Sequence, residues 1–507
     1  MKYETIIGLE VHVQLLTRSK MFCSCRADYQ AASPNSLVCP VCLGMPGVLP
    51  VVNKRAVEYT IMTGLALNCR ISPYTRFDRK NYPYPDLMKG YQISQYDTPI
   101  AKGGYLEVEA SGYTKKIGIT RVHLEEDVAK LQHVTSPRPS ATPLPLGEGL
   151  GVRSYSLVDV NRSGVPLMEV VSEPDMRSSE EARLYLTSVH SILQYLGVST
   201  CNMQDGSFRC DANVSIRPVD STVFMSKVEV KNMNSFRAVY NALEYEVDRQ
   251  TRVVEDGGRV VQETRGWVEE RGVTVSQRSK EYAHDYRYFP EPDLPTLMLD
   301  PAWVEEIRGR LPEQPAQRRV RFVDQYGLPP YDANLLTGSR ATADYFESCL
   351  GLVEAKYASS LLGSRAKGLS NWILVEMGRL LNLKGMEITS ARVTPAHMVE
   401  LVELIDSGTL STTLAKTVLE ESFDTGKAPG DIVKERGYVQ ISDSSVVDSA
   451  VEEAIKSNPQ ALADYLKGKD TAARFLVGQA MKITRGKANP ALVNRLVKEK
   501  LEAMKTS

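Results

Sequence analysis

Four cysteines near the N-terminus form two closely spaced pairs. Cys23 and Cys25 are separated by one residue, Cys39 and Cys42 are separated by two, and thirteen residues lie between the pairs. Two such pairs complete the tetrahedral four-sulfur shell of a zinc ion, which leaves no coordination position for a substrate. Four unrelated thiols or a redox CxxC motif are the alternatives, but neither accounts for the neighbouring pair. We therefore expect a structural zinc site.

Acidic residues form a second group whose types and spacing could do chemistry. Glu10 and His12 are two positions apart in an alternating segment, so a strand would place both on one face. Three consecutive acids occur within 123–127, and Asp211 and Asn213 are again two positions apart. Carboxylates that converge on a cleft hold Mg2+ together with substrate phosphates. Paired acids also commonly face solvent, so their convergence is a hypothesis at this point.

Basic and aromatic residues are interleaved in 77–86 and 284–290, and the segment 92–97 places Tyr96 among polar residues. Such mixtures stack on nucleic-acid bases and neutralise phosphates. Aromatic residues beside prolines also pack within ordinary loops, and the sequence favours neither interpretation.

Several familiar motifs for nucleotide binding and hydrolysis do not occur. The sequence has no GxxxxGK[ST] phosphate loop, no set of kinase motifs and no GxGxxG after a strand. No GxSxG elbow and no amidase-like Ser-Lys arrangement is evident either. If the chain uses ATP, we expect an unorthodox site.

The sequence predicts strands in the first part of the chain, where they would position these residues, and helices in the remainder. Leu9–Leu15 alternates apolar and polar residues as a half-buried strand does. Ser178 and Glu181 have capping-box spacing before an apolar stripe that Gly197 ends, which predicts a helix. Beyond the proline-rich stretch 289–295, the periodicity is helical. These patterns predict an α+β fold, in which a mixed and antiparallel sheet precedes two all-α domains.

One stretch, 136–153, differs from the rest in composition. It contains four prolines and three glycines, so it cannot form a regular element and has little to bury. We expect a mobile surface loop rather than a lid over the active site.

Length and composition place the chain among ordinary globular proteins. Its 507 residues correspond to about three domains. The balance of 61 Lys and Arg against 62 Asp and Glu argues against a protein that coats nucleic acid by bulk charge. Because there is no signal-peptide core and no apolar run of membrane-spanning length, we expect a soluble, reduced, cytoplasmic protein without a membrane partner.

The motifs together resemble the GatB family, the B subunits of aspartyl/glutamyl-tRNA(Asn/Gln) amidotransferases. The matching stretches run nearly from end to end and are longer than chance produces. They are Gly8–Leu15, the cysteine pairs, Pro46–Asn53, Phe77–Asp86, His123–Asp127, Ser156–Leu167, Ser172–Asp175, Arg209–Arg217, Glu229–Phe236, Ala283–Pro295, Gly478–Lys482 and Gly486–Pro490. The 136–153 stretch is the main departure, because relatives have a short turn there.

The resemblance implies an indirect route to amidated tRNA. ATP would phosphorylate the side-chain carboxylate of mischarged Glu-tRNA(Gln) or Asp-tRNA(Asn), and ammonia would displace the phosphate. An amidase-fold glutaminase subunit would supply the ammonia, and a small third subunit would complete a heterotrimer. This agrees with the lack of a recognisable ammonia-releasing nucleophile in the chain. A non-discriminating synthetase is a further partner that the resemblance allows.

The resemblance also implies roles for individual residues. A catalytic Mg2+ site would lie on the matching residues Glu10, His12, Glu125 and Asp211. Candidates for balancing phosphate charge are Arg79, Lys80 and Lys231. Candidates for contacting ATP are Glu126 and Asn213. Candidates for binding tRNA in the tail are Lys482, Arg485 and Lys487.

Family folds imply a catalytic cradle over 1–293, a helical domain over 294–406 and a tRNA-gripping helical tail over 407–507. Charge supports the last of these. Residues 461–507 contain ten Lys and Arg against four Asp and Glu, whereas 406–460 contains five against ten. The near-neutral net charge is therefore an average over a polarised tail whose last helices could meet phosphate.

Two alternatives remain beside this interpretation. A non-catalytic, zinc-containing tRNA-binding module would consume no ATP with mischarged tRNA. The archaeal tRNA(Gln)-specific homologue carries an extra inserted domain, for which 507 residues leave no evident room. The sequence does not indicate whether tRNA(Asn), tRNA(Gln) or both are substrates.

Overall fold

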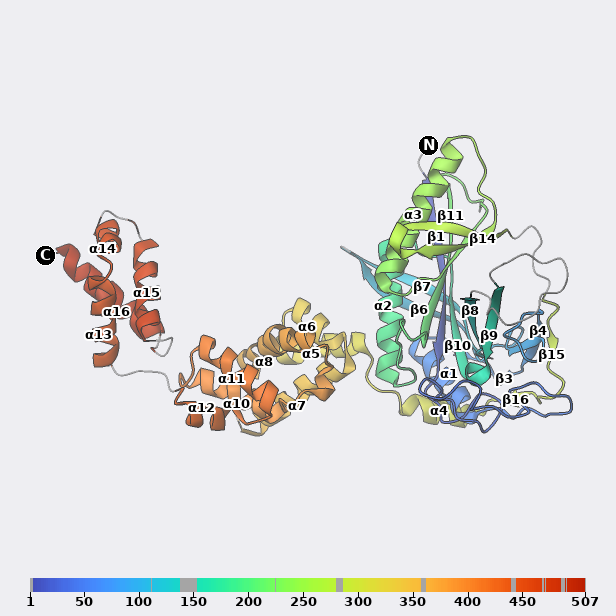
Figure 1. Cartoon of the computed structure of the whole chain (residues 1–507), viewed down its shortest axis with the longest axis horizontal. Coiled ribbons are helices and arrows are strands. Elements are labelled where there is room, and N and C mark those ends of the chain that lie inside the picture. The colour runs from blue at the N-terminus through green and yellow to red at the C-terminus, as the bar shows by residue number, and fades with distance from the viewer. Residues whose placement is uncertain are drawn as a thin grey trace. The chain divides into compact units, whose positions relative to one another are not determined.

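The computed structural model describes residues 3–506 except 111, 137–152, 224, 280–285, 357–361, 439–443, 467–468, 470, 485–487 and 489. The chain divides into two compact units, Met1–Gln314 and Pro315–Ser507 (Figure 1). The first unit holds the strands and the second is helical. The expected α+β class, with a mixed sheet followed by helices, is confirmed.

Among the described residues, twelve strands of the first unit form one sheet, and two further pairs of strands lie beside it. The main path runs β14-β13-β12-β11-β1-β10-β7-β5-β4-β15, and β6 joins β7 to β2. Its neighbouring strands are antiparallel except for the parallel pair β12 and β13. The strands are β1 Tyr3–Gln14, β2 Arg70–Ile71, β3 Tyr74–Thr75, β4 Asp78–Asn81, β5 Tyr91–Ser94, β6 Ala101–Ala110, β7 Tyr113–Glu126, β8 Lys130–Ser136, β9 Arg153–Asp159, β10 Pro166–Ser172, β11 Phe208–Pro218, β12 Val228–Lys231, β13 Glu263–Val268, β14 Val273–Ser279, β15 Phe289–Pro290 and β16 Leu297–Met298.

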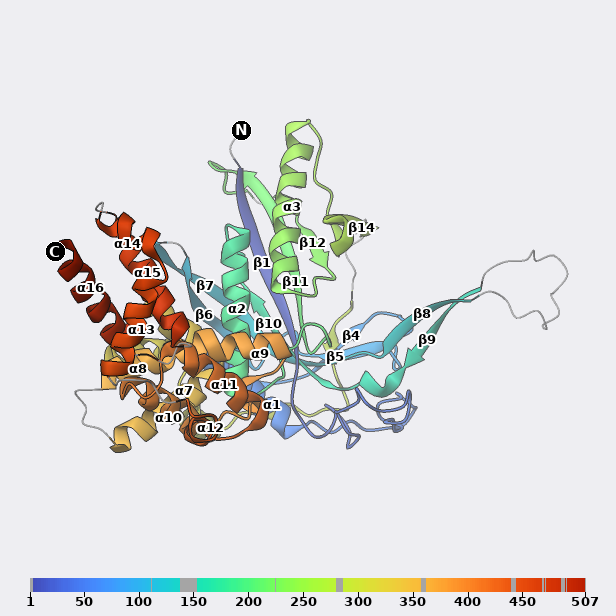
Figure 2. The same cartoon turned by 60° about the vertical axis from the view of Figure 1, so that its left-hand side comes forward.

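Helices cover one face of this sheet, beside β1 and β11 (Figures 1 and 2). The helices of the first unit are α1 Lys54–Ala66, α2 Ser179–Leu196, α3 Phe236–Glu255 and α4 Pro301–Gly309. Val11 and Val13 of β1 share one buried core with Leu186 of α2 and Leu243 of α3. The burial of this apolar face provides the driving force that holds the helices on the sheet.

The helix predicted from capping-box spacing is confirmed as α2. The Ser178 side chain accepts a hydrogen bond from the Glu181 backbone N–H at 3.1 Å, which satisfies a free donor of the first turn. Gly197 ends the helix in the left-handed conformation, with φ of 66°, where glycine carries no steric penalty.

The second unit is built around two separate cores. One core is shared by α5 Pro315–Tyr326, α6 Pro330–Thr337, α7 Arg340–Lys356, α8 Leu362–Asn371, the π-helical turn Trp372–Met377, α9 Gly378–Lys384, α10 Pro395–Asp406, α11 Thr412–Thr425 and α12 Pro429–Arg436. The other is shared by α13 Ser444–Lys456, α14 Pro459–Leu466, α15 Thr471–Ile483 and α16 Pro490–Thr506. No helix within the described ranges is long and apolar enough to cross a membrane.

The three-part division at 293 and 406 stays a proposal, and the packing adds two observations to it. Val304 and Ile307 of α4 belong to the core of the first unit, which extends to Gln314. Helices α11 and α12 belong to the same core as α5–α10.

Strands β8 and β9 form a two-stranded ribbon that leads to and from the unusual stretch (Figure 2). They pair in regular antiparallel register from Lys130↔Asp159 to Ser136↔Arg153. The expected surface loop falls on 137–152, which lie outside the described residues.

A buried ion network links α3 to the edge of the sheet and yields a stability prediction. Glu246 of α3 is fully buried. Its carboxylate accepts from Arg249 Nε at 3.0 Å and from Thr274 Oγ1 at 2.8 Å, and Arg265 Nε lies 3.5 Å away. We expect Glu246→Ala to reduce the free energy of unfolding by about 3 kcal/mol, because it removes the fully buried one of the two carboxylates, Glu246 and Glu263, that Arg249 and Arg265 share.

The control is Asp248→Ala on the same helix, which removes an exposed pair with Arg252. Exposed pairs contribute little to stability, so this variant should unfold near the wild-type urea midpoint. Equal midpoints for the two variants would contradict the role given to Glu246.

Candidate active site and zinc centre

The face of the sheet opposite the helices carries polar side chains from adjacent strands. Alternation on β1 directs Val11 into the core and His12 to the other face. The register places His12 opposite Glu169 of β10 and Arg209 of β11, and Glu169 opposite His123 of β7. Residues far apart in sequence are therefore brought together by strand pairing.

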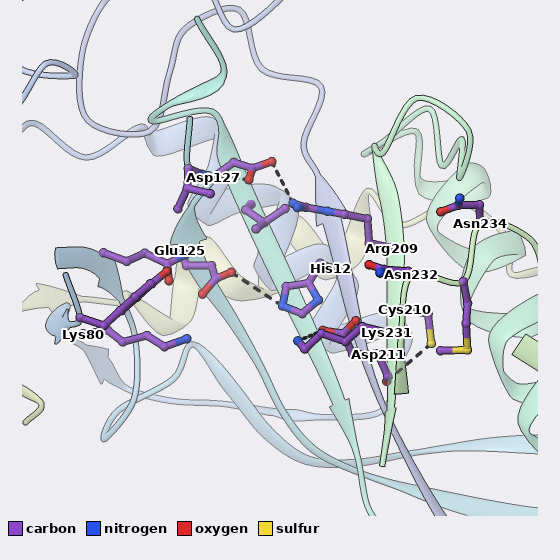
Figure 3. A pocket seen from close by; sticks show the side chains of 15 residues that line it. His12, Lys80, Glu125, Asp127, Arg209, Cys210, Asp211, Lys231, Asn232 and Asn234 are labelled. Carbon is purple, nitrogen blue, oxygen red and sulfur yellow. Dashed lines mark hydrogen bonds and ion pairs between the residues drawn. The ribbon is translucent and has the colours of Figure 1, made fainter. Parts of the chain in front are cut away.

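Of these side chains, His12 and Arg209 line a cavity of about 360 Å³ (Figure 3). Five of the predicted catalytic residues belong to its lining, and they are His12, Lys80, Glu125, Asp211 and Lys231. The rest of the lining consists of Tyr82, Gln92, Asp127, Val128, Leu167, Arg209, Cys210, Asn232, Met233 and Asn234.

An acidic cluster adjoins this cavity through His12 and Glu125, which are among the lining residues. His12 Nε2 is 3.9 Å from Glu125 Oε1 and 3.6 Å from Glu169 Oε2. The three residues each offer one ligand atom, and these atoms all lie within 4.8 Å of one another. One nitrogen and two carboxylate donors in this arrangement fit a divalent cation.

Burial controls the protonation of the acidic cluster. It lowers the pKa of His12 well below its ordinary value, so the imidazole is neutral and one ring nitrogen is free to accept. Burial and the neighbouring Glu125 carboxylate raise the pKa of Glu169 to about 8. Burial also raises the pKa of Glu125, against the opposing effect of Lys80. A cation bound here would favour the ionised form of both acids.

Basic side chains approach the same cavity from two sides of His12 (Figure 3). Lys231 Nζ lies 2.6 Å from Asp211 Oδ2 and 3.1 Å from Glu229 Oε1. Burial opposes the charge on Lys231, but these two carboxylates outweigh it and raise its pKa. On the other side, burial opposes the charge on Lys80, but the combined attraction of Glu125, Glu169 and the neighbouring tyrosines outweighs it and raises the pKa of Lys80.

Asp127 holds Arg209 at the rim of the cavity. Arg209 Nη2 donates to Asp127 Oδ2 at 2.8 Å, and Gln14 Nε2 donates to the same oxygen at 2.7 Å. Because Asp127 is almost fully buried, these donors compensate the loss of hydration of its carboxylate. The result is a positively charged group held in place beside the acidic cluster.

The structure does not bring Arg79 to this cavity. Alternation along β4 directs it away from the side that Lys80 faces. Its guanidinium donates to both oxygens of Glu291 at 2.7 Å and to Asp293 at 3.2 Å, and it lies 4.4 Å from the Tyr91 ring centroid.

Three further predicted residues lie beside the cavity rather than in it. Glu126 Oε1 accepts from the Ile93 backbone N–H at 3.0 Å and also binds Lys89. Glu10 accepts from Asn213 Nδ2 at 2.8 Å, and both line a neighbouring cavity of about 330 Å³. Glu10 remains on the same face as His12, directly opposite Asp211.

Sequence reasoning missed Glu169 and assigned no role to Asp127 and Arg209. Glu169 lies in the otherwise apolar run 165–171, whose pattern predicts a buried strand. The presence of one acidic residue in such a run is the sequence signal that could have identified it. Arg209 and Asp127 each lie within segments that carry recognisable motifs. Their mutual contact depends on the register of β11 and β7 with their neighbours, which the sequence does not specify.

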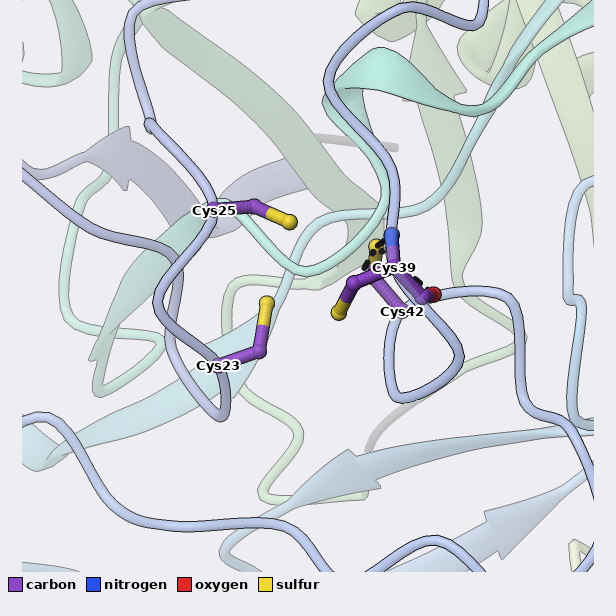
Figure 4. Close-up of side chains that lie close together, drawn as sticks. All are labelled: Cys23, Cys25, Cys39 and Cys42. Carbon is purple, nitrogen blue, oxygen red and sulfur yellow. Dashed lines mark hydrogen bonds between the residues drawn. The ribbon is translucent and has the colours of Figure 1, made fainter.

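The four cysteines of the predicted zinc site converge from two loop segments (Figure 4). Each contributes one sulfur, and all four sulfurs lie within 4.8 Å of one another. Cys39 Sγ and Cys42 Sγ are 3.9 Å apart, close to the roughly 3.8 Å that a tetrahedron with Zn–S bonds of about 2.3 Å requires. None of the four forms a disulfide. The cluster is compatible with a structural zinc ion.

The electrostatics of the cluster also suit a metal. A hydrogen bond from Cys23 lowers the pKa of Cys42, with further help from the backbone at Cys39 and from Lys20. The Cys39 backbone N–H donates to Cys42 Sγ at 3.1 Å. A thiolate is the form that ligates zinc, so Cys42 is prepared for binding.

The predicted tRNA-binding residues lie near the end of the chain. Lys482 is exposed in the last turn of α15. Arg485 and Lys487 lie outside the described residues.

Comparison with known proteins gives consistent matches along the chain. Residues 5–305 match the GatB/GatE catalytic domain, and residues 355–501 match the GatB domain. The chain is 54% identical to the B subunit of the aspartyl/glutamyl-tRNA(Asn/Gln) amidotransferase of Carboxydothermus hydrogenoformans, over 99% of each chain. It is also 54% identical to the proteins that carry this name in Dehalococcoides mccartyi and Moorella thermoacetica, over 99% of this chain and 99% and 100% of theirs.

The cysteine cluster yields a metal prediction. Protein purified without a chelating tag should contain one zinc ion per chain by elemental analysis. Cys39→Ser combined with Cys42→Ser should lose the metal and lower the melting temperature, because two of four ligands are gone. Cys349→Ala, a buried cysteine of the second unit, should keep the zinc. Wild-type protein without stoichiometric zinc would contradict the assignment.

Proposed function

Because the chain belongs to the GatB family, the B subunits of aspartyl/glutamyl-tRNA(Asn/Gln) amidotransferases, we propose that its cavity carries out both chemical steps of tRNA-dependent amidation. ATP phosphorylates the side-chain carboxylate of mischarged Glu-tRNA(Gln) or Asp-tRNA(Asn). Ammonia then converts the activated group into an amide. The chain is thus the ATP-dependent ligase component of a translation enzyme.

Two bond exchanges accomplish this conversion. A carboxylate oxygen forms a bond to the γ-phosphorus, and the bond from that phosphorus to ADP breaks. Ammonia then bonds to the carbonyl carbon, and the carbon–oxygen bond to phosphate breaks. The phosphate leaves with the electron pair and takes the proton that ammonia loses. Activation is needed because a carboxylate has no acceptable leaving group, whereas an acyl phosphate does.

The observation that carries the proposal is the meeting of basic side chains and an acidic cluster in one cavity. Lys80, Arg209 and Lys231 approach from three different strands, and His12 and Glu125 lie between them. Positive groups held in place by acidic partners stabilise charge on a transferring phosphoryl group without rearranging. The volume of about 360 Å³ suits a phosphate group and a short side chain.

Residues in and beside the cavity would hold Mg2+. The proposed ligands remain Glu10, His12, Glu125 and Asp211, and the position of Glu169 makes it a further candidate. When bound, Mg2+ would neutralise charge on the β- and γ-phosphates. Asn213 is proposed to contact ATP from the neighbouring cavity, and Glu126 from its position beside Lys89.

The chain is proposed to receive its ammonia from a partner. Cys210 is the thiol among the residues that line the cavity, and burial raises its pKa well above the ordinary value, so it is a poor nucleophile. In a heterotrimer with a small third subunit, an amidase-fold glutaminase subunit would supply ammonia. Lys482, Arg485 and Lys487 would contact tRNA.

Glu125 is the residue with which to test the chemistry. In the assembled complex, Glu125→Gln should reduce ATP-dependent phosphorylation more than about 100-fold, because it removes a charged ligand from the acidic cluster. Binding of aminoacyl-tRNA should remain within about twofold. The readout is ADP release and amide formation with Asp-tRNA(Asn) and Glu-tRNA(Gln) assayed separately.

The matched control is Glu107→Gln, an exposed acid on β6 of the same sheet, which should act like wild type. Unchanged amide formation in Glu125→Gln would refute the site. A wild-type complex that binds tRNA but consumes no ATP with either substrate would favour the non-catalytic module.

The unusual stretch yields a prediction about activity. Ser136 and Arg153 are paired across β8 and β9, so a two-residue Asn-Gly turn can join the strands where residues 137–152 now lie. We expect this deletion to leave kcat and KM within about twofold of wild type. A loss of activity larger than tenfold in a folded deletion variant would assign the stretch a role in the reaction.

A further inference from the structure

Four tyrosines from three separate segments meet at one edge of the sheet. Tyr82 follows β4, Tyr96 follows β5, and Tyr286 and Tyr288 precede β15. Because β15 pairs with β4 and β4 pairs with β5, the segments become neighbours. The ring centroids of Tyr82 and Tyr286 are 5.7 Å apart, and those of Tyr286 and Tyr288 are 6.1 Å apart. We refer to these four residues as the tyrosine cluster.

The tyrosine cluster adjoins the catalytic cavity. Tyr82 itself lines that cavity, as does Lys80. Lys80 Nζ lies 5.1 Å from the Tyr286 ring centroid and 5.8 Å from that of Tyr82, within the range of cation–π attraction. Burial, followed by the carboxylates of Glu125 and Glu169, raises the pKa of Tyr288, which is consistent with a ring close to the same acids.

The outer ring of the cluster is open to a ligand. Tyr96 stacks on Tyr288 with centroids 4.2 Å apart and an interplanar angle of 11°. Tyr288 covers one face of the Tyr96 ring, yet Tyr96 is 52% exposed. The ring therefore presents a supported aromatic surface to solvent beside a cavity proposed to bind an aminoacyl group.

The chemistry of the proposed substrate restricts what can occupy that surface. The reacting carboxyl carbon of a glutamyl ester is joined to the ribose of the terminal nucleoside through about five covalent bonds, which span roughly 6 Å. When that carboxylate lies in the cavity, the ribose must lie at the mouth of the cavity and its base just outside. The tyrosine cluster adjoins the cavity through Tyr82, and its rings continue outward from there to Tyr96.

We propose that the tyrosine cluster is the platform on which the 3′-terminal base of the aminoacyl-tRNA stacks, with Tyr96 in direct contact. The inference rests on the proposed function and extends it to the recognition of the acceptor end. An exposed ring offers stacking without an enclosing pocket, which suits an unpaired base at the end of a strand. Small nucleotides bind mostly in enclosed clefts, so the base of ATP is the less suitable occupant.

The test compares Tyr96→Ala with Tyr96→Phe in the assembled complex. Tyr96→Ala should raise KM for aminoacyl-tRNA about tenfold, because stacking of a base on an aromatic ring is lost. KM for ATP should stay within about twofold. Tyr96→Phe should act like wild type, since stacking needs the ring and not the hydroxyl. Tyr331→Ala, an exposed tyrosine of α6 in the second unit, is the control and should change neither constant.

A binding experiment separates this inference from the proposed reaction. The affinity of the wild-type complex for tRNA should fall about tenfold when the 3′-terminal nucleoside is removed. Tyr96→Ala should bind intact and truncated tRNA equally, because each change removes the same contact.

Two results would overturn the inference. The first is a Tyr96→Ala complex whose affinity for tRNA still falls about tenfold when the 3′-terminal nucleoside is removed. The other is a rise in KM for ATP in place of aminoacyl-tRNA, which would assign the platform to the nucleotide. A wild-type complex that shows the truncation penalty but no ATP-dependent phosphorylation would reject the proposed reaction while supporting the platform.

Discussion

The candidate site depends on the register of one central strand. β1 lies between β10 and β11, and its alternation sends Val11 into the core while His12 faces the cavity. A shift of one residue would bury the polar set and expose the apolar set. Because the apolar face is covered by α2 and α3, such a shift would lose the burial that stabilises the domain. Packing on one face thus determines the chemistry on the other.

Charge compensation is the second requirement of this face. Glu125, Asp127 and Glu169 are all almost fully buried, and an isolated buried carboxylate is costly. Asp127 is compensated by Arg209, whereas Glu125 and Glu169 share the field of Lys80, and burial raises the pKa of both. The cluster therefore favours an additional positive charge, and the basic groups around it favour a negatively charged ligand. A metal–phosphate substrate satisfies both demands together.

Structural features that depend on residues close together in the sequence could be predicted from the sequence. The cap at Ser178, the stop at Gly197 and the convergence of the cysteines follow from local spacing. The direction of a side chain could not be predicted where that direction depends on strand pairing. Arg79 and Lys80 are neighbours in a charged motif, and only the pairing of the four-residue β4 shows that Lys80 faces the cavity while Arg79 binds Glu291. Glu169 was missed for the related reason that its strand is otherwise apolar.

The division of roles within the first unit follows from these constraints. All residues that line the candidate cavity lie between His12 and Asn234, within the first unit. The proposed chemistry can thus be assembled by strands of the sheet and the segments that directly follow them, whereas recognition of a tRNA needs contacts well beyond a cavity of this size. Near the cavity, the tyrosine cluster is joined to the chemistry through Lys80, which touches both. Lys80 would thus couple the placement of the acceptor end to the charge balance at the reacting carboxylate, since the rings of Tyr82 and Tyr286 attract the ammonium group that faces the cavity.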